Sequence, residues 1–109
     1  MSPIVVQEVM RGEIGFDGLI MSDDLSMKAL KGPFDERAAA VIEAGLDIVL
    51  HCNGDLKEAR AAASATPPLS GASLRRANAA LAATRPPEPL DAERAEREFA
   101  AIKAELGAA

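Results

Sequence analysis

The amino-acid sequence predicts an α/β fold with parallel strands, and two observations carry that prediction. Residues 19–21 (LIM) and 46–50 (LDIVL) are short apolar runs of the kind found in strands that are buried on both faces. Between them, residues 34–45 place apolar side chains at helical spacing, so we expect a helix to join the strands. Two strands joined in this way pair in parallel through a right-handed crossover.

The first element is expected to be a short helix that ends near Gly12. Ser2 can cap this helix, and Pro3 suits its first helical position because a nitrogen there needs no partner. One side of the helix carries three apolar residues, which are Ile4, Val5 and Val9.

A turn and the first strand follow that helix. Gly15 breaks the helix, and residues 16–18 form a turn that leads into the apolar run at 19–21. Ser22 and Asp23 are polar, so we expect them to end the strand.

The helix at residues 34–45 has favourable signals at its N-terminus and a stop signal at its C-terminus. Asp35 and Glu36 lie in the first turn, where negative charge interacts well with the helix dipole. Gly45 is expected to close the helix. The apolar positions of this helix are Phe34, Ala38, Val41 and Ile42.

Three more helices are expected after the second strand. An alanine-rich helix spans about residues 55–65, and Pro67 and Pro68 stop it. Ser70 is expected to cap the next helix, and the proline-rich residues 85–89 form a stiff linker to a terminal helix. The apolar positions are Leu74, Ala77 and Leu81 in the former, and Ala95, Phe99, Ile102 and Leu106 in the latter.

Composition excludes several classes of function. The net charge of -5 gives no attraction to phosphate backbones or anionic membranes, so neither nucleic acid nor a membrane is an expected partner. Cys52 is the single cysteine, which rules out an intrachain disulfide and favours a reducing compartment. The sequence shows neither a secretory signal nor a membrane-spanning run, and we therefore expect a cytoplasmic protein. No cofactor is expected, and the spacing of the acidic residues after Asp23 does not match a calcium-binding loop.

Two adjacent aspartates follow the first strand, where parallel α/β folds carry their catalytic groups. Side chains of neighbouring residues in an extended chain point to opposite sides, so Asp23 and Asp24 are not expected to act on one bond together. Retaining glycoside hydrolysis needs a carboxylate nucleophile and a separate proton donor, and this chain supplies one obvious half of that pair. The residue pattern alone leaves another interpretation open, in which Asp23, Asp24 and Ser26 only cap a loop or helix.

The stretch GFDGLIMSDDLSM at residues 15–27 closely resembles the motif around the catalytic aspartate of family 3 glycoside hydrolases. Its SDDLSM portion is most similar to the bacterial β-N-acetylhexosaminidases of that family. The later stretch AAAVIEAGLDIVLHCN resembles the next helix and the last barrel strand of these enzymes. The resemblance implies a partial (β/α)8 TIM barrel, in which residues 1–66 are the last two β/α units and residues 67–109 are a C-terminal helical tail.

The resemblance also assigns roles to residues of this chain. Asp23 matches the nucleophile that forms a covalent glycosyl-enzyme intermediate. Asp24, Ser26 and Met27 match the loop that shapes the floor of the sugar pocket. The proton donor of the family is a histidine paired with an aspartate on a mobile loop before the nucleophile, and no segment of this chain matches it.

Three residues after the second strand also bear on the site. His51 is the only histidine and could act as an acid or base beside Asp23, although a structural or surface role is favoured because the family usually has an aliphatic residue there. Asn53 is a candidate for a hydrogen bond at the edge of the sugar pocket. Cys52 is expected to be a buried small hydrophobe. Outside this region, Arg75 and Arg76 are expected on a solvated helix face rather than in an anion site.

Two functions from different classes follow. The first is the C-terminal part of a β-N-acetylhexosaminidase that removes N-acetylglucosamine from cell-wall fragments. We expect it to be inactive alone, because the acid catalyst and most sugar contacts are absent from this chain. The second is a noncatalytic helical interaction module that retains the motif as a remnant. Met1 falls inside a segment that resembles a barrel helix, which leads us to expect a truncated or incomplete chain.

Overall fold

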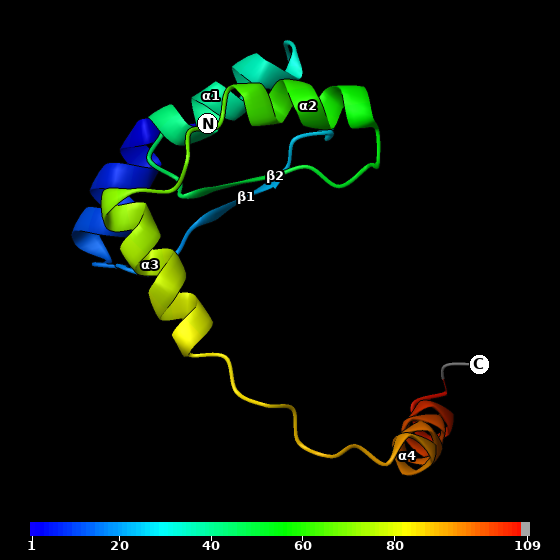
Figure 1. Ribbon diagram of the computed structural model, residues 1–109. Coiled ribbons are helices and arrows are strands. Elements are labelled where there is room, and N and C mark those ends of the chain that lie inside the picture. The colour runs from blue at the N-terminus through cyan, green and yellow to red at the C-terminus, as the bar shows by residue number, and fades with distance from the viewer. Residues whose placement is uncertain (108–109) are drawn as a thin grey trace.

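The computed structural model describes residues 1–107, in which short strands and helices alternate along the first half of the chain (Figure 1). This order confirms the α/β class expected from the sequence. The elements are η1 (Val5–Glu13), β1 (Met21–Asp24), α1 (Phe34–Glu43), β2 (Ile48–Leu50), α2 (Leu56–Ser64), α3 (Gly71–Ala82) and α4 (Ala92–Glu105).

The two strands pair in parallel, as predicted, with Met21 opposite Ile48 and Asp24 opposite Leu50. The first strand starts at Met21 instead of residue 19, so Ser22 and Asp23, which were expected to end it, form its middle. Ser22 makes this possible because its buried hydroxyl accepts a hydrogen bond from the Leu50 amide at 3.0 Å and donates one to the Asp23 carbonyl at 2.8 Å.

Helices α1 and α2 pack together over one face of the sheet (Figure 1). The core beneath them is formed by the side chains of Leu25, Ala38, Val41 and Ala62. The predicted apolar face of the helix at 34–45 is therefore the face that packs. On the other side of the sheet Met21 is 55% exposed, and residues 1–107 hold a two-stranded sheet with no closed barrel.

The first helix is wound mainly as a π-helix, in which the Ile14 amide bonds to the Val9 carbonyl at 2.9 Å. Its covered side carries Val6 and Met10, which pack against Ile20 and Ala44. Of the three apolar residues expected on one side of this helix, Ile4 and Val5 are exposed and lie outside the packed side. Helical spacing allowed either side, and only the contact with the following segments decides between them.

Helix α3 begins after Ser70, as predicted, but its predicted apolar side is uncovered because Leu74 and Leu81 are exposed. Polar residues of α3 bond to Asp17 and Asp47 instead. The division of the chain at residue 66 stays a prediction.

Helix α4 lies apart from the other elements at the end of an extended linker (Figure 1). Asp91 caps this helix by accepting a hydrogen bond from the Arg94 amide at 3.0 Å. Its predicted apolar stripe is present in the sequence but uncovered, since Phe99, Ile102 and Leu106 are all exposed. Among residues 1–107, each helix is too short or too polar to cross a membrane.

Candidate active site at the carboxyl ends of the strands

Strand β1 presents its two aspartates to opposite sides of the sheet. Along the strand, Met21 and Asp23 are exposed, whereas Ser22 is buried and Asp24 is partly buried. This alternation follows from the pleat of an extended backbone. Asp23 therefore shares the uncovered face with Met21, and Asp24 faces the side that the helices cover.

The carboxylate of Asp23 makes one hydrogen bond within residues 1–107, in which the Asp24 amide donates to Asp23 Oδ1 at 2.8 Å. This bond fixes the direction of one oxygen and leaves the exposed carboxylate accessible from the uncovered face. A carboxylate in this position can act as a nucleophile towards a molecule that lies over that face.

The carboxylate of Asp24 is instead bound to its own loop. Asp24 Oδ1 accepts from the amide of Ser26 at 3.0 Å and from the amide of Cys52 at 3.3 Å, and Oδ2 accepts from the Ser26 hydroxyl. These hydrogen bonds, those of Ser26 above all, lower the pKa of Asp24 to about 2. Asp24 is therefore ionised near neutral pH and joins the loop after β1 to the loop after β2.

The other predicted substrate-binding residues lie in these same two loops. Met27 is 44% exposed, and its amide donates to the Asp24 carbonyl at 3.2 Å. Asn53 is committed to the start of α2, because its Oδ1 accepts from the Asp55 amide at 2.8 Å and its amide group donates to Glu58. The structure thus brings Asp24, Ser26 and Cys52 into contact, while Asn53 bonds to neither aspartate of β1.

His51 lies on the helix side of the sheet, where its side chain is 6% exposed. Its ring meets the ring of Phe34 edge to face, with centroids 5.0 Å apart. Asp23 is exposed on the uncovered side, so the favoured structural interpretation of His51 fits the geometry better than a role as acid or base beside that carboxylate.

Cys52 departs from the sequence prediction, because this residue is an exposed free cysteine instead of a buried hydrophobe. It follows β2 in a loop, and the apolar environment of the strand does not extend to it. A hydrogen bond with Asp24 and the nearby negative charge raise the pKa of the Cys52 thiol. The thiol is therefore not activated as a nucleophile.

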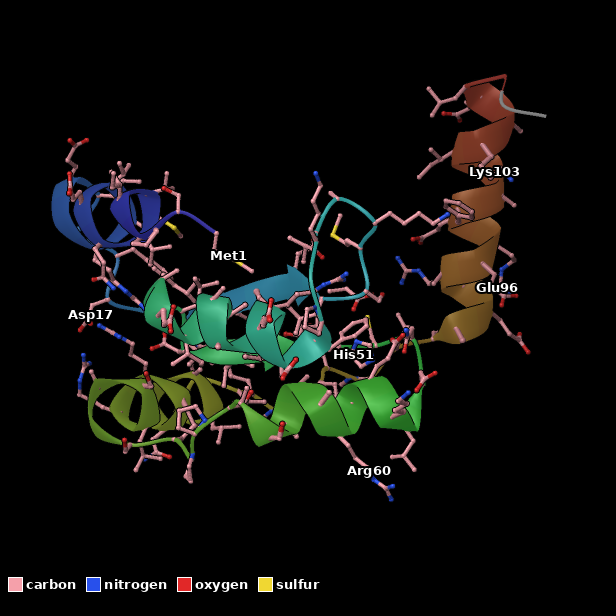
Figure 2. All side chains as sticks on the ribbon, turned by 90° about the horizontal axis from the view of Figure 1, so that it is seen from above. Met1, Asp17, His51, Arg60, Glu96 and Lys103 are labelled. Atoms are coloured by element: carbon pink, nitrogen blue, oxygen red, sulfur yellow. The ribbon has the colours of Figure 1, made fainter. Side chains whose placement is uncertain are left out.

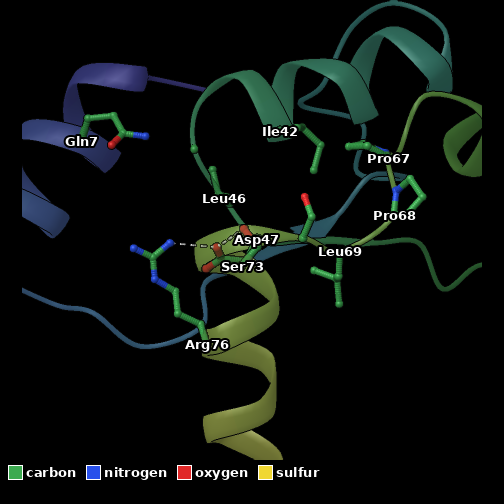
Figure 3. Close-up of a pocket in the computed structure, with 11 residues that line it drawn as sticks. Gln7, Ile42, Leu46, Asp47, Pro67, Pro68, Leu69, Ser73 and Arg76 are labelled. Carbon is green, nitrogen blue, oxygen red and sulfur yellow. Dashed lines mark hydrogen bonds and ion pairs between the residues drawn. The ribbon is translucent and has the colours of Figure 1, made fainter.

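A second polar cluster surrounds Asp47, which precedes β2 and so lies at the opposite, amino end of that strand (Figure 3). The buried Asp47 Oδ2 lies 2.7 Å from Arg11 Nη2 and 2.9 Å from the Ile20 amide. Its Oδ1 accepts from the Ser73 hydroxyl at 2.7 Å and from Arg76 at 3.1 Å. Although burial raises the pKa of Asp47, these hydrogen bonds lower it overall. The cluster joins η1, the residue before β1 and α3 to the residue before β2, and no local pattern in the sequence indicates it.

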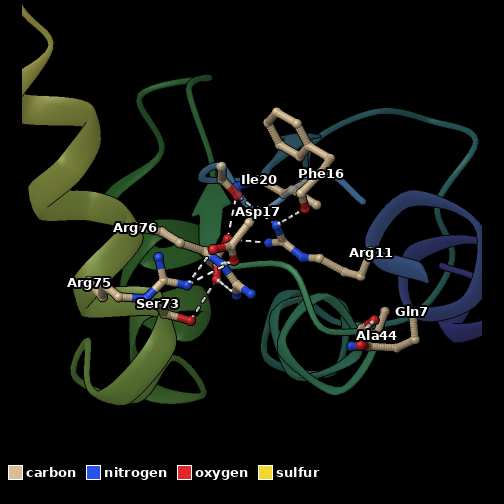
Figure 4. Close-up of polar contacts among 11 residues, drawn as sticks. Gln7, Arg11, Phe16, Asp17, Ile20, Ala44, Ser73, Arg75 and Arg76 are labelled. Carbon is tan, nitrogen blue, oxygen red and sulfur yellow. Dashed lines mark hydrogen bonds and ion pairs between the residues drawn. The ribbon is translucent and has the colours of Figure 1, made fainter. Parts of the chain in front are cut away.

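Arg75 and Arg76 also bond to Asp17, at 2.8 Å and 3.1 Å (Figure 4). These bonds lower the pKa of Asp17. The expectation of a solvated helix face is wrong for Arg76, whose side chain is 16% exposed and lies between two carboxylates. A sequence pattern can indicate an ion pair when the aspartate and the arginine lie a few residues apart. The partners of these pairs lie far apart in the sequence, so no such pattern indicates them.

A cavity of about 320 Å³ lies beside the Asp47 cluster (Figure 3). Its charged lining residues, Asp47 and Arg76, already pair with each other. Gln7, Pro67 and Pro68 also line the cavity. The cavity is therefore a weaker candidate for chemistry than the exposed Asp23 at the other end of the strands. Within residues 1–107, the histidine, cysteine and acidic side chains form no trio arranged to hold a metal ion.

Comparison with known proteins shows similarity over most of the described chain. Residues 1–83 match the model of the family described as "Glycosyl hydrolase family 3 N terminal domain". The beta-hexosaminidase of Tolumonas auensis is 45% identical over 75 residues, which cover 62% of this chain and 21% of that protein. The beta-hexosaminidase of Alkalilimnicola ehrlichii is 52% identical over 50 residues, covering 44% and 14%, and that of Chromobacterium violaceum is 44% identical over 70 residues, covering 62% and 20%. The chain thus spans about a fifth or less of the length of these curated relatives.

Proposed function

Since the chain belongs to glycosyl hydrolase family 3, we propose that it forms the nucleophile-bearing part of a retaining β-N-acetylhexosaminidase, with Asp23 as the nucleophile. The observation that supports this role is the position of Asp23 near the carboxyl end of β1, exposed on the face that α1 and α2 leave uncovered. In a parallel barrel, that face would be the interior, where sugar and catalytic groups meet. The two β/α units of this chain would be the last two of the barrel.

In the proposed reaction, an oxygen of Asp23 attacks the anomeric carbon while the bond to the leaving sugar breaks. A proton donor from the remaining part of the barrel protonates the departing oxygen. Water then attacks the same carbon from the opposite face of the ring and displaces Asp23, while the group that acted as proton donor takes a proton from the water, so the product retains its β configuration. The Asp24 amide, which donates to Asp23 Oδ1, would hold the carboxylate in the direction of attack.

The residues around Asp23 would shape the sugar site. Asp24 and Ser26 would hold the floor of the site through their hydrogen bonds, and the exposed Met27 would offer it an apolar surface. Asn53 would contribute a polar group at the edge, at the cost of one of its bonds at the start of α2.

The relatives are named beta-hexosaminidases, which supports a glycan with terminal N-acetylglucosamine as the substrate class. We extend the proposal to cell-wall fragments and to a cytoplasmic location, with which the free thiol of Cys52 is compatible. The N-terminal portion of a barrel is the expected partner, and the isolated 109 residues should have no meaningful turnover because they lack a proton donor.

The experiment that tests the proposal is a graft into the Tolumonas auensis relative. A 75-residue stretch of that protein matches this chain, and the matching region is replaced by residues of this chain chosen to include Asp23. We expect the graft to hydrolyse an aryl N-acetyl-β-glucosaminide, and Asp23→Asn to reduce the rate by about a thousandfold or more. Asp35→Asn is the matched control, because Asp35 is an exposed acid in the first turn of α1.

A fluorinated substrate that slows the second step would trap the covalent intermediate on the peptide containing Asp23. A graft that folds and hydrolyses equally well with Asp23→Asn contradicts the assignment of the nucleophile. Product with inverted configuration contradicts the retaining mechanism.

A noncatalytic interaction module is the second candidate, and the exposed stripe of α4 favours it. Phe99 is 64% exposed and Leu106 is 77% exposed, although both lie on one side of an amphipathic helix. Binding of a defined protein that is lost in Phe99→Ser would support this function, provided that the graft described above shows no dependence on Asp23.

A further inference from the structure

His51 is a buried titratable side chain that the proposed reaction does not use. Its side chain is 6% exposed, and neither ring nitrogen has a hydrogen-bond partner within residues 1–107. Such groups normally find a partner, because a buried polar atom without one is costly. Figure 2 shows His51 beside the packed helices. The arrangement around the ring indicates which partners are within reach.

Each nitrogen of the ring faces a carboxylate just beyond hydrogen-bond distance. His51 Nδ1 lies 3.7 Å from Asp24 Oδ1, and Nε2 lies 3.5 Å from Glu58 Oε2. A neutral imidazole carries one N–H, so either tautomer turns a lone pair towards one of these carboxylates. The imidazolium form donates from both nitrogens, so it is the only form that can bond to both carboxylates at once.

The other polar and charged groups near the His51 ring bond to other partners and do not take the place of the two carboxylates. Arg37 of α1 lies 4.7 Å from the centroid of the Phe34 ring, on which His51 packs, and its guanidinium donates to the Leu25 carbonyl at 2.6 Å. Cys52, next in the chain, is hydrogen-bonded to Asp24. Asn53 donates to Glu58 Oε2 and so holds this carboxylate near the ring. The ring therefore lies between one acid from β1 and one from α2.

We propose that His51 is a positioning residue that, as an imidazolium, bridges Asp24 and Glu58 and holds the loop after β1 against α2. Shortening each pair by about 1 Å or less would bring both to the usual length of such hydrogen bonds. Asp24 then transmits the effect, because its amide donates to the carboxylate of Asp23. The bridge itself is a property of the folded chain, and only its consequence for sugar cleavage rests on the proposed function.

The bridge makes the stability of the loop depend on pH. The protonated ring can donate to both carboxylates at once, whereas a neutral ring can donate to only one of them, so the bridge is complete only in the protonated form. Asp24 stays ionised near neutral pH, since its pKa is about 2.

Hydrogen exchange of the amides of Ser26 and Cys52 measures this directly, because both donate to Asp24 Oδ1. After correction for the intrinsic exchange rate, we expect these amides in the full chain to open about fivefold less often at about pH 5.5 than at about pH 8. His51→Gln should abolish the difference. Glu13→Gln, which removes an exposed acid of η1, should leave it unchanged.

NMR of the ring in the unmodified chain provides a second measurement that needs no variant. His51 is the only histidine, so its signals are identified without ambiguity. At about pH 5.5 we expect both ring N–H protons to be visible, because the bridge protects them from exchange with water. Loss of both signals, or amides of Ser26 and Cys52 that exchange at the unprotected rate or equally at both pH values, would overturn the proposal. None of these readouts involves a sugar, so the bridge and the role of Asp23 can fail independently.

Discussion

The guanidinium of Arg11 lies 2.7 Å from the carboxylate of Asp47, and this pair connects the first helix to the start of the second strand. The side chain of Asp47 is 1% exposed, so the carboxylate is removed from water and depends on its protein partners. Because Ser73 and Arg76 of α3 bind its other oxygen, one side chain holds three segments against β2. A group in this position stabilises the arrangement that exposes Asp23 at the other end of the sheet.

Asp47→Ala should therefore destabilise the chain strongly. The substitution leaves Arg11, Arg76 and the Ile20 amide without their common acceptor, and breaking a buried pair in this way costs about 3 to 5 kcal/mol. Urea unfolding of the two proteins measures the loss. Asp17→Ala is the control, and it should have little effect because Asp17 is exposed. A loss from Asp47→Ala below about 1 kcal/mol would contradict the role of this cluster.

The loop after β1 should weaken in strong acid. The pKa of Asp24 is lowered in the folded chain to about 2 from an ordinary value of 3.8, so the stability that its carboxylate provides is present above pH 3.8 and is lost as pH falls through about 2. The difference in unfolding free energy between the original chain and Asp24→Asn should shrink across this interval. If this difference in unfolding free energy stays constant down to about pH 2, the hydrogen bonds from Ser26 and Cys52 to Asp24 do not depend on the charge of Asp24.

Leu25→Ala should open a cavity under α1 and α2. Leu25 is fully buried against Ala38, Val41 and Ala62, and substitutions of this type cost about 2 to 5 kcal/mol. Met27→Ala in the same loop should change stability by about 0.5 kcal/mol or less, because Met27 is exposed. Thermal unfolding of both variants compares them, and equal losses would contradict the packing described for the loop.

Removal of the chain after Thr84 should leave the rest as stable as before. Helix α4 lies apart from the sheet, and the side chains of its apolar stripe are exposed (Figure 1). Figure 2 shows Glu96 and Lys103 on the same isolated helix. The unfolding free energy of residues 1–84 should agree with that of the full chain within about 0.5 kcal/mol. A larger loss would show that the stripe packs against the sheet or its helices.

Much of the fold follows from patterns that are local in the sequence. The helix at Phe34–Glu43 and the turn at Gly45, whose φ of 95° favours glycine, were both predicted, because helical spacing and a left-handed closing residue act over a few positions. The limits of β1 were less predictable. Its polar residues form a strand only because Ser22 bonds across to Leu50, a contact between distant parts of the chain.

For the candidate site, the pattern SDDLSM and the alternation of an extended backbone suffice to separate Asp23 from Asp24 and to indicate the family. They do not determine which side of each helix is covered, where Cys52 lies, or how Asp47 is paired. The sequence by itself determined the α/β class, the parallel strands and the opposed directions of the two aspartates, since these depend on neighbouring residues. Only the tertiary structure decided that His51 lies between Asp24 and Glu58 and that Arg76 lies between Asp17 and Asp47, because those positions depend on packing between residues far apart in the chain.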